Sequence, residues 1–171
     1  MPTQGKSFTN HPGLVDYKGN TYFFYHNGAL PDGGGFHRSV CVEQLKFNED
    51  GTIPTLNMTK EGAPQIGHFD PYVTVQAETI CWASGVETQP CKEGGMNVCD
   101  VHDGDTIKVK GVDFGKGTAT FEVRVASATN GGNIQIHLDS ETGPLAGTCA
   151  VSGTGGWQNW VTTSCGIKDV T

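Results

Sequence analysis

The sequence predicts an all-β protein, and three observations support this class. Glycine accounts for 25 of 171 residues and only 17% of residues are charged, a composition that favours a loop-rich β protein over a helical one. No window of eleven residues keeps a helical period without an interrupting glycine or proline. Short runs alternate instead: Ile134, Ile136 and Leu138 are separated by polar residues, which is the period of a half-buried strand.

Residues 8–67 contain a first group of predicted strands. Residues 14–17 and 21–26 flank a Lys-Gly-Asn turn and predict a hairpin. Residues 38–47 predict a further strand, which a strong turn signal at 48–51 ends. Three or four strands are too few to close a fold alone, so this segment is expected to belong to a larger domain.

Residues 69–171 contain a second group of short strands, and the boundary between the two segments is expected near residues 68–71. In the clearest strand, 118–128, Phe121 and Val123 face inward between charged neighbours. Regular short strands with intervening turns predict a β-sandwich. The expected strands are 72–77, 106–110, 118–128, 133–139, 147–151 and 157–165.

The net charge of −7 argues against nucleic-acid binding, where a basic face is expected, and against an anionic membrane surface. The sequence has no apolar run of 18 residues and no charged-then-apolar leader. We therefore expect neither a spanning helix nor a signal peptide in this chain.

Six cysteines are many for this length, and none of them forms a Cys-x-x-Cys pair, so zinc is not expected. We predict disulfides of a secreted, extracellular protein instead. Spacing alone leaves the pairing open; the candidate pairs are Cys91–Cys99 and Cys149–Cys165, with Cys81 as the candidate unpaired thiol. Secretion without a leader suggests that the chain starts partway along a longer one.

A glycine-rich turn, residues 152–156, leads into Trp157 and Trp160. Glycines let a sugar ring approach closely, and an indole face stacks on the C–H side of such a ring. Two residues three apart on a strand face opposite sides, so one indole is expected outside the main core. Trp157, beside the glycines, is the candidate; the alternative is that both indoles are core residues.

Five stretches between residues 75 and 162 carry a resemblance to a known family. They read VQAETI (75–80), GGMNVCDVHDGDTIKVKGVDFG (94–115), EVRVAS (122–127), IQIHLDSETGPLAGT (134–148) and GTGGWQNWVT (153–162). Together they resemble a carbohydrate-binding module of family 6, which is a jelly-roll β-sandwich. Such modules continue through at least one more core strand after the position of Cys165, so the resemblance implies a C-terminally truncated sandwich.

The first segment resembles the last part of a family 43 glycoside hydrolase. The matching stretches read NHPGLVDYKGNTYFFYHNG (10–28) and GGFHRSVCVEQLKFNEDGTI (34–53). This family is a five-bladed β-propeller that acts on arabinose- and xylose-containing polysaccharides, and it often precedes a family 6 module in one secreted enzyme. The resemblance implies a partial propeller at residues 1–68 and a jelly-roll sandwich at residues 69–171.

The family 6 resemblance places the sugar-stacking aromatic at Trp157, with Asp100 and Asn97 as hydrogen-bonding loop groups. Asp100 stands where such modules usually carry a tyrosine, so stacking on one face of the sugar only is expected. Gln76 and Glu78 match a pair that helps to hold a structural Ca²⁺, and oxygen donors suit that cation. We therefore expect calcium in the intact module.

The family 43 resemblance implies no catalytic residue in this chain. The acid and the base that flank a glycosidic bond lie on earlier blades, before residue 1, so the chain should be inactive alone. His11 matches a histidine that points into the central cavity of the propeller, and Arg38 matches an arginine that reaches the substrate pocket. The alternatives are a loop histidine bonded to backbone and a surface arginine.

The expected function is binding of xylan or arabinoxylan by the accessory module of a secreted family 43 hydrolase that degrades plant polysaccharides. Two alternatives stay open. The chain could instead be part of the hydrolase itself, acting with the remainder of the catalytic domain as an arabinofuranosidase or xylosidase. It could also be a structural brace that binds no ligand.

Overall fold

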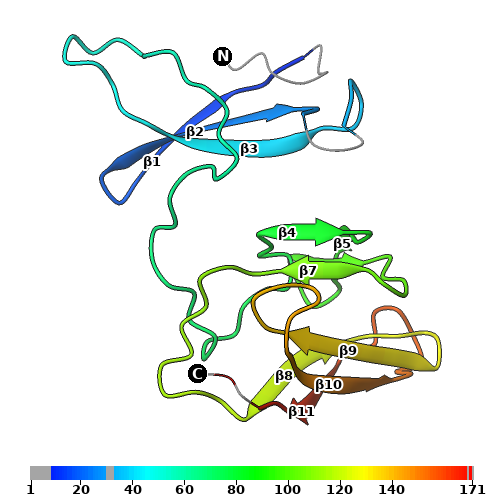
Figure 1. Ribbon diagram of the computed structural model, residues 1–171. Helices are drawn as coiled ribbons and strands as arrows, with labels where there is room; N and C mark the ends of the chain where they lie inside the picture. Colours follow the sequence, from blue (N-terminus) through cyan, green and yellow to red (C-terminus); the bar gives the residue numbers. More distant parts are fainter. Residues whose placement is uncertain (1–8, 30–32, 169, 171) are drawn as a thin grey trace. The chain divides into compact units, whose positions relative to one another are not determined.

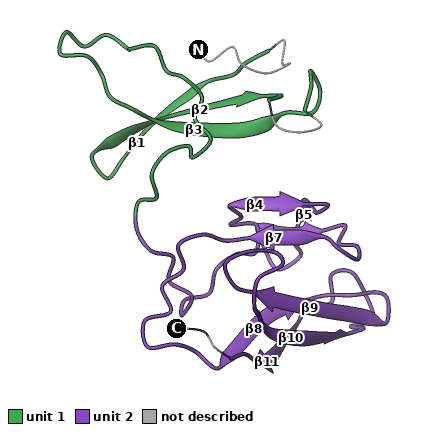
Figure 2. Cartoon of the chain, in the orientation of Figure 1, with its two compact units in different colours: residues 1–66 green, residues 67–171 purple. Residues whose placement is uncertain are grey.

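The computed structural model describes residues 9–29, 33–168 and 170, and within them it contains eleven β-strands and no helix (Figure 1). The predicted all-β class is confirmed. The chain divides into two compact units, residues 1–66 and 67–171 (Figure 2). The predicted boundary lies between residues 68 and 69, which is two residues later. The described residues thus include no helix that is long and apolar enough to cross a membrane.

Unit 1 is built on one antiparallel sheet in the order β1-β2-β3, formed by Gly13–Tyr17, Asn20–Asn27 and Ser39–Leu45. The turn from β1 to β2 has positive φ at both central residues, 48° at Lys18 and 75° at Gly19. This backbone matches the twist of the flanking strands. The predicted hairpin and the strand after it are therefore confirmed.

The core of unit 1 lies against one face of this sheet. Phe23 and Tyr25 are two residues apart on β2 and share one face of the sheet, and their ring centroids are 5.6 Å apart. Leu45 at the end of β3 is buried with them. The extended segment after β3 closes this core, with Leu56 and Met58 packed against it. The extended segment therefore covers the apolar face of the sheet and completes the hydrophobic cluster.

A buried carboxylate fixes this extended segment to the sheet. Glu43 on β3 is 6% exposed, and its side chain accepts hydrogen bonds from the Thr59 main-chain N–H at 2.7 Å and from the Thr59 hydroxyl at 3.0 Å. The Tyr25 hydroxyl donates to the same carboxylate at 3.4 Å. Burial, together with the nearby Cys41 and Glu43, raises the pKa of Tyr25, so this hydroxyl remains a donor at physiological pH.

Unit 2 contains eight strands in four antiparallel pairs, β4 with β7, β5 with β6, β8 with β11, and β9 with β10. Figure 1 shows β4, β5 and β7 on one side of this unit and β8 to β11 on the other, as expected for a sandwich. The bounds are Trp82–Ser84, Glu87–Pro90, Met96–Cys99, Thr106–Lys108, Thr120–Val125, Gly131–His137, Leu145–Ser152 and Val161–Gly166 for β4 to β11.

The predicted strand at residues 72–77 is wrong. This segment follows a turn in which the Tyr72 N–H donates to the Asp70 carboxylate at 2.8 Å, and the Tyr72 hydroxyl donates to the Phe114 and Gly117 carbonyls. The side chain therefore caps another loop instead of joining a sheet. Conversely, the sequence prediction omitted β4, β5 and β6, which are only three or four residues long.

The register of the β5–β6 hairpin excludes the predicted Cys91–Cys99 disulfide. Cys99 lies opposite Glu87, whereas the Cys91 N–H bonds to the carbonyl of Gly95, at the other end of the hairpin. Four residue steps along a strand are about 13 Å, and a disulfide requires Cα atoms within about 7 Å. The candidate pairing of Cys91 with Cys99 is therefore wrong.

Candidate functional site

The turn between β10 and β11 carries the most exposed tryptophan of the described chain. Trp157 is 62% exposed and follows Gly155, whose φ of 79° is disfavoured for residues with a side chain. The expectation that Trp157 lies outside the core is confirmed, although its stated reason is wrong: neither tryptophan is in a strand, because β11 begins at Val161. The indole is thus presented by a glycine turn.

The turn is fixed at its base by a reciprocal pair of hydrogen bonds. The Thr154 N–H donates to the Ser127 carbonyl at 2.8 Å, and the Ser127 N–H donates to the Thr154 hydroxyl at 2.8 Å. Ser127, just after β8, is buried. One end of the turn is therefore anchored to a different strand of the sandwich.

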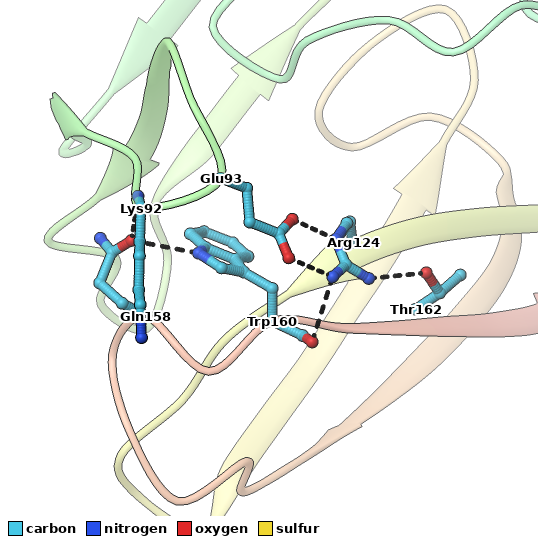
Figure 3. A network of polar contacts seen from close by, with 6 residues as sticks. All are labelled: Lys92, Glu93, Arg124, Gln158, Trp160 and Thr162. Atoms are coloured by element: carbon cyan, nitrogen blue, oxygen red, sulfur yellow. Dashed lines mark hydrogen bonds and ion pairs between the residues drawn. The ribbon is translucent and has the colours of Figure 1, made fainter.

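Gln158 anchors the other side of the Trp157 turn (Figure 3). Its side-chain carbonyl accepts the Lys92 main-chain N–H at 2.8 Å and the Trp160 indole N–H at 3.1 Å. Its amide donates to the Asn97 side-chain carbonyl at 3.3 Å. Because Gln158 is the next residue after Trp157, these three contacts limit the orientations that the exposed indole can adopt.

Arg124 on β8 extends this network to β11. Its guanidinium forms a bidentate ion pair with Glu93 and also donates to the Trp160 carbonyl at 3.3 Å and the Thr162 hydroxyl at 3.2 Å (Figure 3). The hydrogen bonds from Arg124 hold the pKa of the Glu93 carboxyl below its ordinary value. Both side chains are nearly half exposed, so the pair positions the turn more than it stabilises the fold.

Asp100 and Asn97, the two polar residues predicted to contact sugar, differ in their exposure to solvent. Asp100 is exposed, adopts a φ of 54° and lies 3.9 Å from the His102 ring nitrogen, so its carboxylate is available at the surface. Asn97 is only 8% exposed; its amide donates to the Val98 carbonyl and its carbonyl accepts from Gln158. The predicted direct contact of Asn97 with sugar is therefore corrected. Because the Asn97 side chain is buried and bonded to Gln158, it holds Gln158 in place.

Calcium is the cation predicted at Gln76 and Glu78. The two side chains offer two of the six to eight oxygen ligands that Ca²⁺ takes. No group of three or more His, Cys, Asp or Glu side chains in the described part of the chain is arranged to hold a metal ion. The expectation of calcium therefore stays a prediction.

In unit 1, His26 contacts His11. The His11 main-chain N–H and its ring Nδ1 lie 3.2 and 3.4 Å from the His26 Nε2 atom. Arg38, just before β3, contacts the Thr9 hydroxyl. Burial, Arg38 and His11 together lower the pKa of His26. His11 thus contacts His26, and the charge of Arg38 acts on the same imidazole. The sequence prediction did not select His26.

Acidification should weaken unit 1 through His26. Because the folded-state pKa of His26 is lowered, the unfolded chain binds its proton more readily, and stability is lost as the pH falls through about 6.5 towards the folded value. Hydrogen exchange of β1 and β2 at pH 7.5 and pH 5.5 should show faster opening at the lower pH. His26→Gln should reduce this difference, whereas replacement of the exposed His37 should leave it unchanged.

The chain matches known sequences along nearly its whole length. Residues 76–171 match the sequence model of the carbohydrate binding module (family 6). An arabinoxylan arabinofuranohydrolase from Paenibacillus polymyxa is 38% identical over 177 residues, which cover 98% of this chain and 28% of that protein. A Bacillus subtilis protein of the same name is 36% identical, with coverage of 86% and 30%. The chain spans less than a third of the length of these relatives.

Solved structures give the same two resemblances. A family 43 arabinoxylan arabinofuranohydrolase from Bacillus subtilis, solved with cellotetraose, superposes with a TM-score of 0.83 at 34% identity and covers 95% of this chain and 35% of that chain. A family 6 module from Clostridium cellulolyticum, solved with xylose, has a TM-score of 0.59 at 48% identity, covering 60% and 80%. The predicted combination of the two families is confirmed.

Proposed function

The chain belongs to carbohydrate-binding module family 6 over residues 76–171, and from this premise we propose that unit 2 binds xylan or arabinoxylan by stacking a sugar ring on Trp157. The observation that carries the proposal is the exposed indole on an anchored glycine turn. The C–H face of a pyranose suits the flat indole face. A similar module solved with xylose supports the choice of sugar.

Asp100 is the candidate acceptor for hydrogen bonds from the sugar hydroxyls. Its carboxylate is exposed and follows β6 directly. The same strand carries Asn97, which is bonded to Gln158, the neighbour of Trp157 in sequence. With an aspartate there, the ring stacks on one face only. Single-module affinity is therefore weak, since an open site immobilises a sugar without burying much of it.

The chain acts as an accessory region of a secreted arabinoxylan-degrading hydrolase. The arabinofuranohydrolase similarity extends over both units. Binding by unit 2 would raise the local concentration of polysaccharide at a tethered catalytic domain. In the same hydrolase, His11 and Arg38 of unit 1 would contribute to the substrate pocket. The contact of His11 with His26 and the effect of the Arg38 charge on the same imidazole support this role.

Affinity electrophoresis of the whole chain tests this function. Native gels containing soluble xylan, arabinoxylan or no polysaccharide are compared, with a non-binding reference protein in each lane. Retardation in the xylan and arabinoxylan gels is expected. Equal mobility in all three gels would contradict sugar binding and would favour the structural brace. Release of nitrophenol from nitrophenyl arabinoside or xyloside would overturn the proposal that the chain has no activity of its own.

Replacement of Gln158 by alanine should weaken xylan binding several-fold without abolishing it. The change removes three hydrogen bonds that fix the Trp157 turn and leaves the buried Asn97 carbonyl without its donor, at a cost of about 1–3 kcal/mol in unfolding free energy. Lys92→Ala is the matched control, because Lys92 donates its main-chain N–H and keeps it. Equal retardation of the two variants would show that this network does not position the indole.

A further inference from the structure

Strands β10 and β11 approach each other at the end of the described chain. The Lys168 N–H donates to the Ala146 carbonyl at 3.0 Å, and a Cβ atom on Gly147 would lie 2.7 Å from the Gly166 carbonyl oxygen. In the sheets β10 pairs with β9 and β11 with β8, yet these two contacts bring the segments that contain Cys149 and Cys165 side by side. A disulfide requires Cα atoms within about 7 Å of each other.

The two thiols lie in one buried environment. Cys149 has no exposed surface, Cys165 is half-buried, and the side chain of Cys149 acts on the titration of Cys165. Burial, followed by the nearby Cys149 side chain, raises the pKa of the Cys165 thiol. A thiol of this kind is a poor nucleophile in the folded protein, so any oxidation of the pair belongs to the folding process.

We propose that Cys149 and Cys165 form a disulfide during oxidative folding and that this bond closes the base of the turn that carries Trp157. The disulfide itself does not depend on the proposed function. Only its consequence, a more rigid turn for sugar binding, rests on that function. Both cysteines flank this turn, since β10 ends at Ser152 and β11 begins at Val161. The bond would link the two strands that the turn joins.

The oxidant is a low-molecular-weight disulfide such as glutathione disulfide. One cysteine thiolate attacks it to give a mixed disulfide and one free thiol, and the second cysteine then displaces the other thiol. The protein loses two protons and two electrons, the S–S bond forms, and the oxidant is reduced to two thiols. No other co-reactant is needed.

Refolding with peptide mapping tests the bond. The whole chain is reduced and denatured, refolded in a glutathione redox buffer, denatured again in iodoacetamide without a reductant, and digested with chymotrypsin, which cleaves after Trp157 and Trp160 between the two cysteines. Mass spectrometry should find the peptides of Cys149 and Cys165 joined. Recovery of both peptides alkylated would overturn the proposal. The Cys99→Ser variant should retain the linked peptides, because Cys99 lies on β6, whereas Cys165→Ser should lose them.

Two further measurements separate this proposal from the binding function. The oxidised chain should melt about 10 °C higher than the reduced chain, since the bond closes a loop of about 15 residues. Xylan gels of both forms should show stronger retardation of the oxidised form. Absence of retardation in both forms would overturn the sugar-binding proposal, while the linked peptides would still support the disulfide. Equal melting temperatures of the two forms would contradict stabilisation of the fold by the disulfide.

Discussion

Replacement of Trp157 by alanine should abolish the retardation of the chain in xylan gels. The indole is the one large aromatic surface of the proposed site, and loss of its contact with a sugar ring removes about 1.5–3 kcal/mol. That loss raises the dissociation constant by at least about tenfold, which is enough to take a weak single module below detection. Isothermal titration with xylo-oligosaccharides provides the matching affinity measurement.

The fold should survive this change, because the Trp157 ring is mostly exposed and surface substitutions alter stability by about 0.5 kcal/mol or less. Trp160→Phe is the matched control. Trp160 is half-buried and its indole N–H bonds to Gln158, so phenylalanine should lower the melting temperature while sugar binding largely persists. Retention of xylan binding in Trp157→Ala would place the sugar on another surface of the molecule.

The sequence predicted those parts of the fold whose determinants are local. The β1–β2 hairpin follows from a two-residue turn with positive φ at Lys18 and Gly19, a backbone whose twist matches that of the flanking strands. Strand β8 follows from strict alternation over Thr120–Val125. The short strands β4 to β6 could not be predicted, because each has only three or four residues and no longer alternating run around it, whereas the equally short β7 continues into the alternating run 106–110.

The candidate site divides in the same way. Trp157 could be selected because the glycines that present it are its neighbours in sequence. Gln158 could not, because its partners Asn97 and Lys92 are 61 and 66 residues away, and a glutamine carries no local signal of such contacts. The same network explains the correction at Asn97: its side chain was a plausible sugar ligand by type, and only the fold shows that it is buried and already bonded.

Replacement of Tyr25 by alanine should unfold unit 1 and leave xylan binding intact. Tyr25 is 2% exposed, stacks on Phe23 and donates to the buried Glu43 carboxylate. Removal of such a ring creates a cavity and costs about 3–5 kcal/mol, a large part of the stability of a three-stranded unit. Unit 2 has its own strand pairs and Trp157 turn, so its binding should persist.

Hydrogen exchange read by peptide separates the two effects. In Tyr25→Ala, peptides from β1 to β3 should lose protection while those from β8 to β11 keep it, and the chain should still be retarded in xylan. Tyr25→Phe keeps the ring and removes only the hydrogen bond to Glu43, so it should cost about 1 kcal/mol and retain protection in both units. Loss of xylan binding together with unit 1, while β8 to β11 stay protected, would transfer the sugar site to the hydrolase-like unit. In that case Trp157 would be an exposed residue without a role in binding, and His11 and Arg38 would be the next residues to replace.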